Sequence, residues 1–462
     1  MKERIFLMAR KRFLALVGSF VLCAVLINLI GCDLSFGGEM PSETEDASGS
    51  GDAERITAAA ISSATKQEGE YVSEVDTAKT DDNMSGNVEN PIEIADGDAK
   101  MTDFALDLFR AANKDGENTL ISPLSVLVAL SMTANGADGD TREQMESVLG
   151  MSTDELNLCI RAYTAGLPQG EKYRLSIANS IWLKEKEGLS VKDDFLRINE
   201  EYYGADIFKA KFDGQTLGDI NGWVNERTDG MIPEVLDEIP DEAIMYLINA
   251  LAFDAEWAAQ YKEYSVRDGS FTKEDGTTVS VQMMHGDDGR YIEDENATGF
   301  VKFYSGIKYA FVALLPNEDI DVSDYVSSLD GEHIQALLNG SRANLALYTS
   351  IPKFKVGYGV EMSEVLEGMG MVDAFDSLKA DFSRLGQSED GNIYISRVIH
   401  KTFIEVGELG TRAGASTAIE IAEECAPEEI KQVYLDRPFV YMIVDWENKV
   451  PLFVGTMMDP GK

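Results

Sequence analysis

The side chains that most often perform catalysis or bind metals are sparse in this chain of 462 residues. It has three histidines, His285, His333 and His400, and none has a companion at metal-ligand spacing. The sequence also lacks HExxH, a G-x-S-x-G elbow, a P-loop, and a G-x-G-x-x-G placed between a strand and a helix. We therefore expect no metal, no cofactor and no enzyme activity from the chain's own residues.

The segment GELGTRAGASTAIEIAEECAPEE, residues 407–429, combines two patterns that point in different directions. In its first half, every second residue is small and uncharged, as in a strand with one buried face. Its second half is acidic and contains a lone cysteine, which is typical of an exposed loop. One fixed structure does not account for both halves, so the explanation must come from the elements around the segment.

The cysteines restrict the possible disulfides. Cys23 lies inside the apolar N-terminal run and Cys32 at its end, which leaves Cys159 and Cys425 for the folded part. One disulfide between these two is compatible with the count, but a framework of bridges is excluded. We predict two free thiols, with Cys159 packed on a helix as a small apolar residue. Cys425 is expected to be exposed, and its acidic neighbours disfavour the thiolate.

The first 31 residues have the organisation of a signal peptide. Basic residues in MKERIFLMARKR precede the apolar run FLALVGSFVLCAVLINLIG, which ends at Cys32. Residues 29–32, Leu-Ile-Gly-Cys, resemble the lipobox of bacterial lipoproteins, in which the cysteine is acylated and becomes the new N-terminus. An uncleaved transmembrane helix is the alternative, because a span needs about 20 apolar residues. Both interpretations place most of the chain outside the cytoplasm, facing the exterior or the periplasm.

Residues 32–100 are predicted to form an acidic flexible tether, because they are rich in Ser, Gly and carboxylates and almost free of aromatic residues. The whole chain has 40 Lys plus Arg against 81 Asp plus Glu, a net charge of −41. This charge argues against nucleic-acid binding, since a phosphate backbone attracts cationic surfaces. A partner that is attracted by electrostatics should be basic.

Residues 101–462 are predicted to form one large α+β domain. MTDFALDLFRAANK has apolar residues at helical spacing, whereas RLSIANSIWL, AIMYLINALAF, FVYMIVDW and PLFVGTMM are apolar over consecutive positions. Such runs are typical of strands covered on both faces. Asp275 and Gly276 stand between GSFTKE and TTVSVQMM and predict a hairpin turn. We expect extensive sheet, mainly antiparallel and mixed, within this domain.

Residues 118–150, NTLISPLSVLVALSMTANGADGDTREQMESVLG, closely resemble an early segment of the serpins. Further resemblances follow in order: SIANSIWL, INGWVNERTDGMI, LINALAFDAEW, IPKFKV, VIHKTFIEV, RPFVYMIVD and PLFVGTMMDP. Together they cover essentially all of residues 101–462, which makes the resemblance very specific. It implies the serpin fold, an α+β single large domain with three β-sheets, surrounding helices and an exposed reactive-centre loop.

The resemblance also accounts for residues 407–429. In serpins the segment after VIHKTFIEV is the reactive-centre loop, which is exposed as bait for a protease and inserts into the large sheet once it is cleaved. An inserted strand alternates faces, and the inward set here is uncharged and free of proline, as a central strand requires. Its members are Thr411, Ala413, Ala415, Thr417 and Ile419. A slip of one residue would bury Arg412 and Glu420 instead.

Roles for other residues are implied by the resemblance alone. The hinge of the loop begins with Glu408 and Gly410 and continues through Thr411, Ala413, Ala415 and Thr417. The buried polar shutter beneath the central strands matches Ser122, Ser125, Asn249 and His400. The breach, where insertion starts, matches Trp257 and Lys353, and an ion pair between Lys353 and Glu408 is implied.

The scissile bond is placed between Glu424 and Cys425 by counting sixteen residues beyond Glu408, as the family does. A glutamate before the bond suits a protease with a basic specificity pocket, such as a glutamyl endopeptidase. Nearby small or aliphatic residues suit elastase-like or subtilisin-like proteases if a neighbouring bond is cleaved, namely Ile421, Ala422, Cys425 and Ala426.

The function implied is irreversible suicide-substrate inhibition of serine proteases, with cysteine proteases as a second class. The partners are then the protease, in a covalent acyl-enzyme complex, and the membrane through lipidated Cys32, and the inhibitor is expected to be a monomer. The hinge departs from the family's pattern at Gly407, where Asn is common, and at Leu409 and Arg412, where Glu is common. These departures keep open the alternative of a non-inhibitory serpin-fold binding module.

Overall fold

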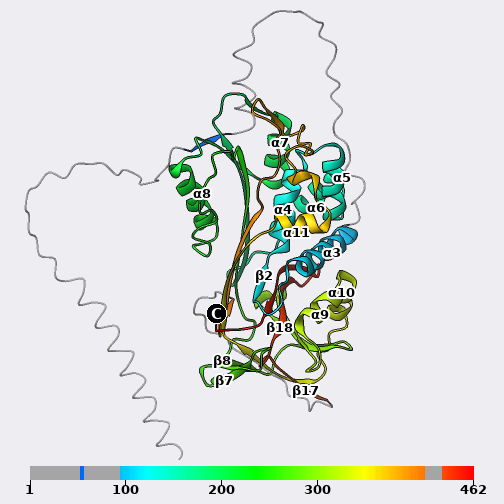
Figure 1. The fold of residues 1–462 in the computed structure, drawn as a ribbon. Helices are drawn as coiled ribbons and strands as arrows, with labels where there is room; N and C mark the ends of the chain where they lie inside the picture. Colours follow the sequence, from blue (N-terminus) through cyan, green and yellow to red (C-terminus); the bar gives the residue numbers. More distant parts are fainter. Residues whose placement is uncertain (1–52, 57–93, 412–428, 462) are drawn as a thin grey trace, which may run out of the picture. The chain divides into compact units, whose positions relative to one another are not determined.

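The computed structural model describes residues 53–56, 94–411 and 429–461, which belong to one compact unit (Figure 1). In none of these residues is there a helix both long and apolar enough to cross a membrane. The predicted signal peptide and the lipidation residue Cys32 lie outside the described residues. The helices are α3 (Ile94–Ala112), α4 (Pro123–Ala134), α5 (Gly139–Leu149), α6 (Thr153–Gly166), α7 (Asp193–Tyr203), α8 (Gly214–Arg227), α9 (Val322–Ser328), α10 (Gly331–Asn339) and α11 (Ser363–Met369).

The largest sheet contains seven strands in the order β1-β5-β3-β6-β16-β15-β13. The long strands β3 and β6 pair antiparallel from Tyr173 opposite Ala255 to Leu183 opposite Met245. Among the described residues, only the two-residue strand β16 stands between β6 and β15. The strands are β1 (Glu54–Ile56), β5 (Asp206–Ala210), β3 (Tyr173–Lys184), β6 (Met245–Glu256), β16 (Gly410–Thr411), β15 (Ile399–Val406) and β13 (Phe354–Glu361).

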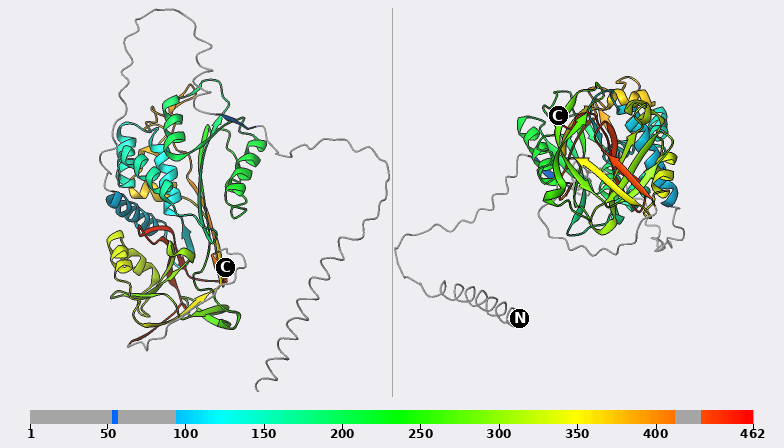
Figure 2. Two further views of the ribbon diagram at one scale, coloured as in Figure 1. Left: turned by 180° about the vertical axis from the view of Figure 1, so that it is seen from behind. Right: turned by 90° about the horizontal axis from the view of Figure 1, so that it is seen from below.

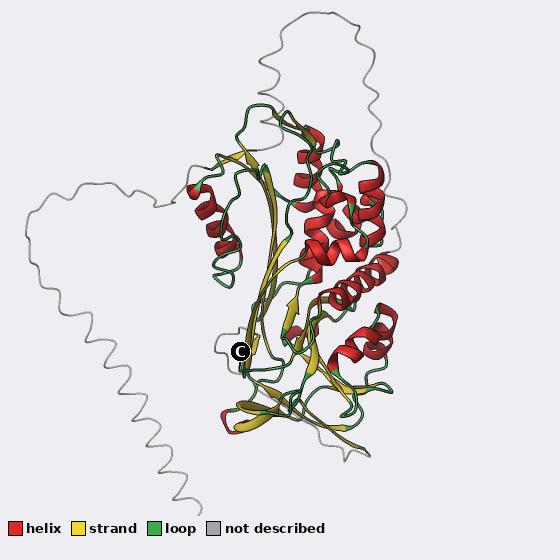
Figure 3. Ribbon diagram, in the orientation of Figure 1, coloured by secondary structure: helices red, strands yellow, loops and turns green. Residues whose placement is uncertain are grey.

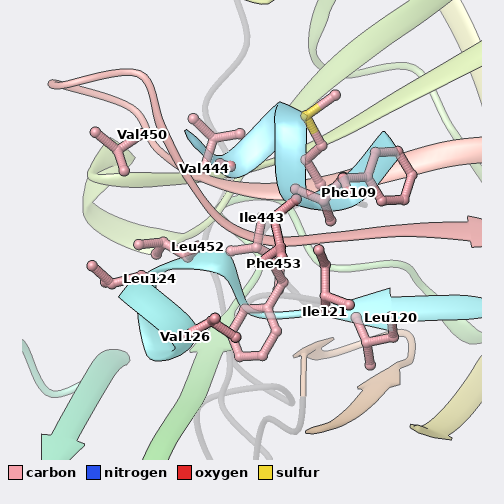
Figure 4. Close-up of a cluster of buried hydrophobic side chains, with 14 of the residues drawn as sticks. Phe109, Leu120, Ile121, Leu124, Val126, Ile443, Val444, Val450, Leu452 and Phe453 are labelled. Carbon is pink, nitrogen blue, oxygen red and sulfur yellow. The ribbon is translucent and has the colours of Figure 1, made fainter. Parts of the chain in front are cut away.

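A second sheet of six strands forms much of the core. Every residue of β18 and β19 is buried, which explains why the sequence is apolar over consecutive positions there. Figure 4 shows Phe109, Ile121, Ile443 and Phe453 gathered in one cluster that joins this sheet to α3 and α4. Each such side chain contributes roughly 1.5–3 kcal/mol by burial. The strands, in sheet order, are β2 (Thr119–Ile121), β19 (Val450–Met457), β18 (Phe439–Asp445), β11 (Tyr309–Pro316), β10 (Ala297–Phe303) and β9 (Arg290–Glu293).

A third sheet contains β17 (Ile430–Tyr434), β12 (Ala346–Pro352), β8 (Thr278–Gly286) and β7 (Val266–Thr272), in that order. Strands β7 and β8 form the predicted hairpin, which closes through Asp275 and Gly276, and Gly276 has the positive φ of 78° that the turn requires. A two-stranded ladder of β14 (Gly386–Ser388) and β4 (Leu189–Val191) adds a fourth sheet to the three predicted. The 3-10 turns are η1 (Glu263–Ser265), η2 (Ser305–Ile307) and η3 (Asp373–Phe375).

Helices cover both faces of the largest sheet. Helix α8 lies against one face, and α3–α7 and α11 gather beyond the other, in Figures 1 and 3 and from behind in Figure 2. Alternate residues of β6 follow this division, because Ile248 and Ala250 pack in the cluster with Trp223 of α8, whereas Leu251 and Phe253 join the main core. Burial on both faces confirms the prediction made from the apolar runs.

The tether was predicted to extend to residue 100, but α3 already begins at Ile94. Gly97 weakens a helix in isolation and looks like a linker residue in the sequence. In the fold, a Cβ at Gly97 would stand 2.6 Å from the sulfur of Cys159 on α6. The glycine therefore permits the close packing of two helices, which composition does not reveal.

A second part of the predicted tether, residues 54–56, forms strand β1 at the edge of the largest sheet. It pairs antiparallel with β5, and the side chain of Arg55 contacts the carboxylate of Asp206. The edge of β5 offers unpaired backbone groups, and a short polar segment satisfies them without an apolar pattern of its own. The rest of the predicted tether before Ile94 lies outside the described residues.

Candidate functional site

The strand β15 turns back on itself and continues as β16. The amide of Gly407 donates to the carbonyl oxygen of Gly410 at 3.0 Å, and Val406 lies opposite Thr411. On its other side β16 pairs with the end of β6. Residues 410–411 therefore occupy the place of a central strand.

Thr411 faces the core. Its side chain is buried, and its hydroxyl lies 2.5 Å from the hydroxyl of Tyr304. Alternation predicts this inward direction for Thr411. The other members of the inward set and both residues of the predicted scissile bond lie outside the described residues: Ala413, Ala415, Thr417, Ile419, Glu424 and Cys425.

Gly410 lies directly against the backbone of β6. A Cβ at this position would collide with the carbonyl oxygen of Ala255 and would stand 2.8 Å from the Cα of Glu256. Because both of these atoms belong to the main chain, they cannot rotate away as a side chain could. Only glycine allows β16 to approach β6 this closely.

Residues just after β6 hold the turn at 407–409. The indole nitrogen of Trp257 donates to the carbonyl oxygen of Gly407 at 2.8 Å, and its backbone amide donates to that of Leu409 at 2.9 Å. The amide of Tyr261 donates to the carbonyl oxygen of Glu408 at 3.0 Å. Leu409, which departs from the family's pattern, thus contributes its backbone carbonyl to this turn, and a residue of any type provides that group.

Trp257 is held by a buried lysine that the sequence analysis did not single out. The indole stacks on Tyr304 with 4.4 Å between ring centroids, and the Lys302 ammonium stands 5.5 Å from the centroid of the indole. Lys302 is 1% exposed and lies 2.7 Å from both carboxylate oxygens of Asp288. It also donates to the carbonyl oxygen of Ala259 at 3.0 Å. The signal in the sequence was a lysine inside the apolar run FVKFY, because a charge there must find a partner.

The ion pair implied between Lys353 and Glu408 is present, with 2.6 Å between Nζ and a carboxylate oxygen. The hydrogen bond from Lys353 lowers the pKa of the Glu408 carboxyl. Both side chains are partly exposed, so solvent weakens their attraction. The pair links the start of β13 to the hinge.

Ser122 and His400 meet beneath the largest sheet. The imidazole Nε2 of His400 accepts a hydrogen bond from the amide of Ser122 at 3.0 Å, so Nε2 carries no proton and the neutral ring is protonated at Nδ1. Burial lowers the pKa of His400 to about 4. The hydroxyl of Ser122 accepts a bond from the Ser125 amide at 3.4 Å and caps α4.

The resemblance groups Asn249 with Ser122, Ser125 and His400 in one buried polar network. The side chain of Asn249 instead bonds to Asn179. Its amide nitrogen donates to the side-chain oxygen of Asn179 on β3 at 2.8 Å, and Asn179 in turn donates to the carbonyl oxygen of Tyr203 at 2.7 Å. The side-chain oxygen of Asn249 is buried without a partner among the described residues. Asn179 was missed because a lone Asn in an apolar run has no pattern of its own.

A cavity of about 350 Å³ lies between β6 and β15, in line with β16. Asn249 and His400 line it from the two strands, and Ser125 and Ala129 of α4 line its floor. In the described residues, no strand pairs with β6 on this side except β16. The backbone groups of two facing strands and the uncharged floor formed by α4 can accept an extended, uncharged segment. They offer no nucleophile paired with a base, and the described residues contain no metal-binding cluster of three or more acidic, His or Cys side chains.

Cys159 is a free thiol among the described residues, and burial raises its pKa to about 11. A raised pKa disfavours the thiolate, which is the reactive form of a cysteine.

Comparisons with known proteins agree with this arrangement. Residues 99–460 match the family model described as serpin (serine protease inhibitor). The chain is 30% identical to the leukocyte elastase inhibitor of Xenopus tropicalis over 375 residues, which are 78% of this chain and 98% of the relative. The relative's name identifies it as a protease inhibitor.

Solved structures show the same fold. The crystal structure of tengpin, a thermophilic serpin in its native state, is 47% identical and has a TM-score of 0.75, covering 80% of this chain and 95% of tengpin. Human thyroxine-binding globulin in complex with its ligand has a TM-score of 0.69 at 24% identity, covering 80% of this chain and all of that chain, which shows the fold alone. On the family model and these relatives together, the chain belongs to the serpin family.

Proposed function

We propose that this protein inactivates serine proteases irreversibly, as a suicide substrate whose cleaved loop becomes a strand of the largest sheet. The observation that carries the proposal is the position of β16. Its two residues already pair with both β6 and β15, and the cavity lies directly ahead of them along the same two strands.

The chemistry belongs to the protease. The hydroxyl oxygen of its catalytic serine attacks the carbonyl carbon of Glu424, the Glu424–Cys425 peptide bond breaks, and the amino group of Cys425 leaves with a proton. Glu424 remains as an ester on the protease. Insertion of residues 411–419 then pulls the attached protease along the sheet and distorts it before water hydrolyses the ester.

The energetic drive comes from the sheet. Each inserted residue gains ladder hydrogen bonds to β6 or β15, and each inward side chain fills part of the cavity, so apolar lining leaves water. The small inward residues fit beneath a sheet whose floor is formed by α4. A charge in the inward set would be buried without a partner and would stop insertion.

The target protease is proposed to accept Glu424 before the bond, with elastase-like and subtilisin-like serine proteases next, and cysteine proteases as a second class. The net charge of −41 favours a basic protease. We further propose that Cys32 carries lipid and that the monomeric inhibitor works on the outer face of the cell membrane, facing the exterior or the periplasm.

The alternative is a serpin-fold module that binds a ligand without inhibiting, as the likeness to thyroxine-binding globulin illustrates at the level of the fold. To separate the two, residues 53–462, which include β1, are incubated with glutamyl-specific, elastase-like and subtilisin-like proteases, and the products are read by denaturing gel and intact mass. An SDS-stable complex and a released peptide that begins at Cys425 support inhibition at the proposed bond. A peptide with another start moves the bond. Cleavage without a complex for every protease rejects inhibition.

A further inference from the structure

The outer face of the third sheet exposes three large apolar side chains on two neighbouring strands. Ile430 and Tyr434 of β17 are 63% and 39% exposed, and Tyr348 of β12 is 45% exposed. The alternate residues Val433 and Leu347 are buried on the inner face. Side chains on the two faces of these strands therefore have opposite environments, and the exposed set lies on one surface.

The pairing of the two strands brings these residues together. Strands β17 and β12 are parallel, with Ala346 opposite Ile430, Tyr348 opposite Gln432, and Ser350 opposite Tyr434. Tyr348 thus lies opposite the residue midway between Ile430 and Tyr434. Exposed apolar groups that cluster in this way mark interaction surfaces, and tyrosine is enriched in them.

Ion pairs hold the beginning of β17 in place. Arg342 contacts the Glu429 carboxylate at 3.2 Å, and Lys431 contacts Glu429 and Glu293 at 3.3 and 3.4 Å. The ammonium of Lys431 also stands 4.8 Å from the ring centroid of Tyr291. Several weak contacts on one strand fix its register, so the exposed face needs little ordering before it binds.

The face begins where the reactive loop ends. Ile430 is the sixth residue after Glu424, and six extended residues reach at most about 20 Å. Figure 1 places β17 together with β7 and β8 at one end of the view, remote from α5 and α7. A protease that holds the Glu424–Cys425 bond in its cleft is therefore held within reach of this sheet, on the side of the residues that follow the bond.

We infer that Ile430, Tyr348 and Tyr434 form a docking surface for the body of the target protease, next to the part of its cleft that binds residues 425–429. The partner surface is apolar or aromatic, and its contact adds to the affinity that the loop itself provides. The inference rests on the proposed function, because the loop brings the protease to this place. Contact with a second copy of this chain is the competing occupant.

The test uses the double variant Tyr348→Ser and Tyr434→Ser, whose side chains point to solvent and leave the core intact. Matched controls are Leu158→Ser on α6 and Leu378→Ser, which remove exposed apolar side chains outside the third sheet, 43% and 90% exposed. A second double variant, Tyr348→Phe and Tyr434→Phe, keeps the apolar surface. Binding is measured by the Kd for the target protease with its catalytic serine replaced by alanine, so no cleavage or insertion is needed.

We expect the double serine variant to weaken binding about tenfold, which corresponds to about 1.4 kcal/mol. The controls and the double phenylalanine variant should stay within twofold of the wild type. Equal affinity of the double serine variant and the wild type overturns the inference.

Two further measurements keep the inference separate from its alternatives. If the wild-type protein forms no covalent complex with the active protease but the double serine variant still binds the inactive protease more weakly, the proposed inhibition fails and the docking surface stands. If the wild type sediments as a dimer and the double serine variant as a monomer, the face joins two copies and the inference is wrong.

Discussion

The hydroxyl of Tyr304 lies 2.5 Å from the hydroxyl of Thr411, so the first inward residue of the loop is already bonded to the core. Tyr304 is fully buried and stacks on Trp257, which in turn holds the turn before Thr411. The same aromatic pair therefore fixes both the turn and the start of the inserted strand. Insertion would begin from residues whose register is already set.

Replacing Thr411 by Arg should convert the inhibitor into a substrate. The guanidinium would face the buried site of Thr411 with no partner, a cost of several kcal/mol, so insertion would stall while the loop was still cut. Denaturing gels should show cleaved protein without covalent complex. Thr411→Val, which keeps the shape, serves as the control and should retain most of the complex. Unchanged complex formation by Thr411→Arg would contradict strand insertion at this position.

Replacing Gly410 by Ala should expel β16 from the sheet, because the new Cβ meets main-chain atoms of Ala255 and Glu256. Gly407→Ala is a matched control three residues away, since a Cβ at Gly407 meets nothing within 4 Å. Hydrogen exchange is measured at the amide of residue 407, which donates to Gly410. The exchange should accelerate in Gly410→Ala. It should stay near the wild-type rate in Gly407→Ala and in Gly368→Ala, a comparable change elsewhere. Equal exchange in the wild type and in Gly410→Ala would show that the hinge adapts to a Cβ.

The Lys353–Glu408 pair should contribute little to stability and should lose its contribution in acid. Because both side chains are partly exposed, a double-mutant cycle with Lys353→Ala and Glu408→Ala should give about 0.2–1 kcal/mol. The pKa of Glu408 is lowered in the fold, so the contribution is present above its usual pKa and disappears as the pH falls through the folded value. The coupling is measured by denaturant unfolding at pH 7 and pH 3. A coupling that grew on acidification would reverse the assigned sign.

His400 should make the protein less stable in moderate acid. Its pKa is lowered to about 4, against 6.5 for an unperturbed histidine. Between pH 6.5 and 4 the imidazole is therefore protonated in the unfolded chain but neutral in the folded protein. The free energy of unfolding falls over this range by about 3 kcal/mol in total. Thermal unfolding of the wild type and His400→Gln is compared at pH 7.5 and 4.5. The difference between the two proteins should shrink in acid, and a constant difference would argue against a buried neutral imidazole.

Replacing Asp98 by Asn should stabilise the protein at neutral pH only. Burial, with the nearby charge of Asp445 as a second cause, raises the pKa of Asp98 to about 6. One of its carboxylate oxygens is buried without a partner in the described part of the chain. The penalty for the ionised form is present above pH 6 and fades as the carboxyl is protonated. The melting temperature of Asp98→Asn should exceed that of the wild type at pH 7.5 and match it at pH 4.5, while Asp115→Asn, at an exposed turn, should match it at both.

Many elements of the domain, and its α+β class, could be predicted from local patterns in the sequence. Consecutive apolar residues in FVYMIVDW and PLFVGTMM predicted strands buried on both faces, and β18 and β19 are buried throughout. Asp275 and Gly276 predicted the hairpin that β7 and β8 form. These features could be predicted because the periodicity of burial and the chemistry of turns are local properties of the chain.

The parity of the loop was also predicted from the sequence. Alternation sorts residues 411–420 into two sets, and the absence of charge identifies the set that begins at Thr411 as the inward one. The placement of Thr411 beside Tyr304 confirms this direction at the one position of the set that the structure describes. The family resemblance suggested the pair of Lys353 and Glu408. Its geometry still depended on how β13 meets the hinge.

The contacts between residues far apart in the sequence could be seen only in the folded chain. Lys302 and Asp288 pair beneath Trp257, Asn179 takes the contact of Asn249, and residues 54–56 leave an acidic segment to complete a sheet edge. Each of these contacts joins chain segments that carry no mutual signal in sequence. They form because a buried charge, a buried amide and an unpaired strand edge each require a partner, and the fold alone determines which group is near enough to supply it.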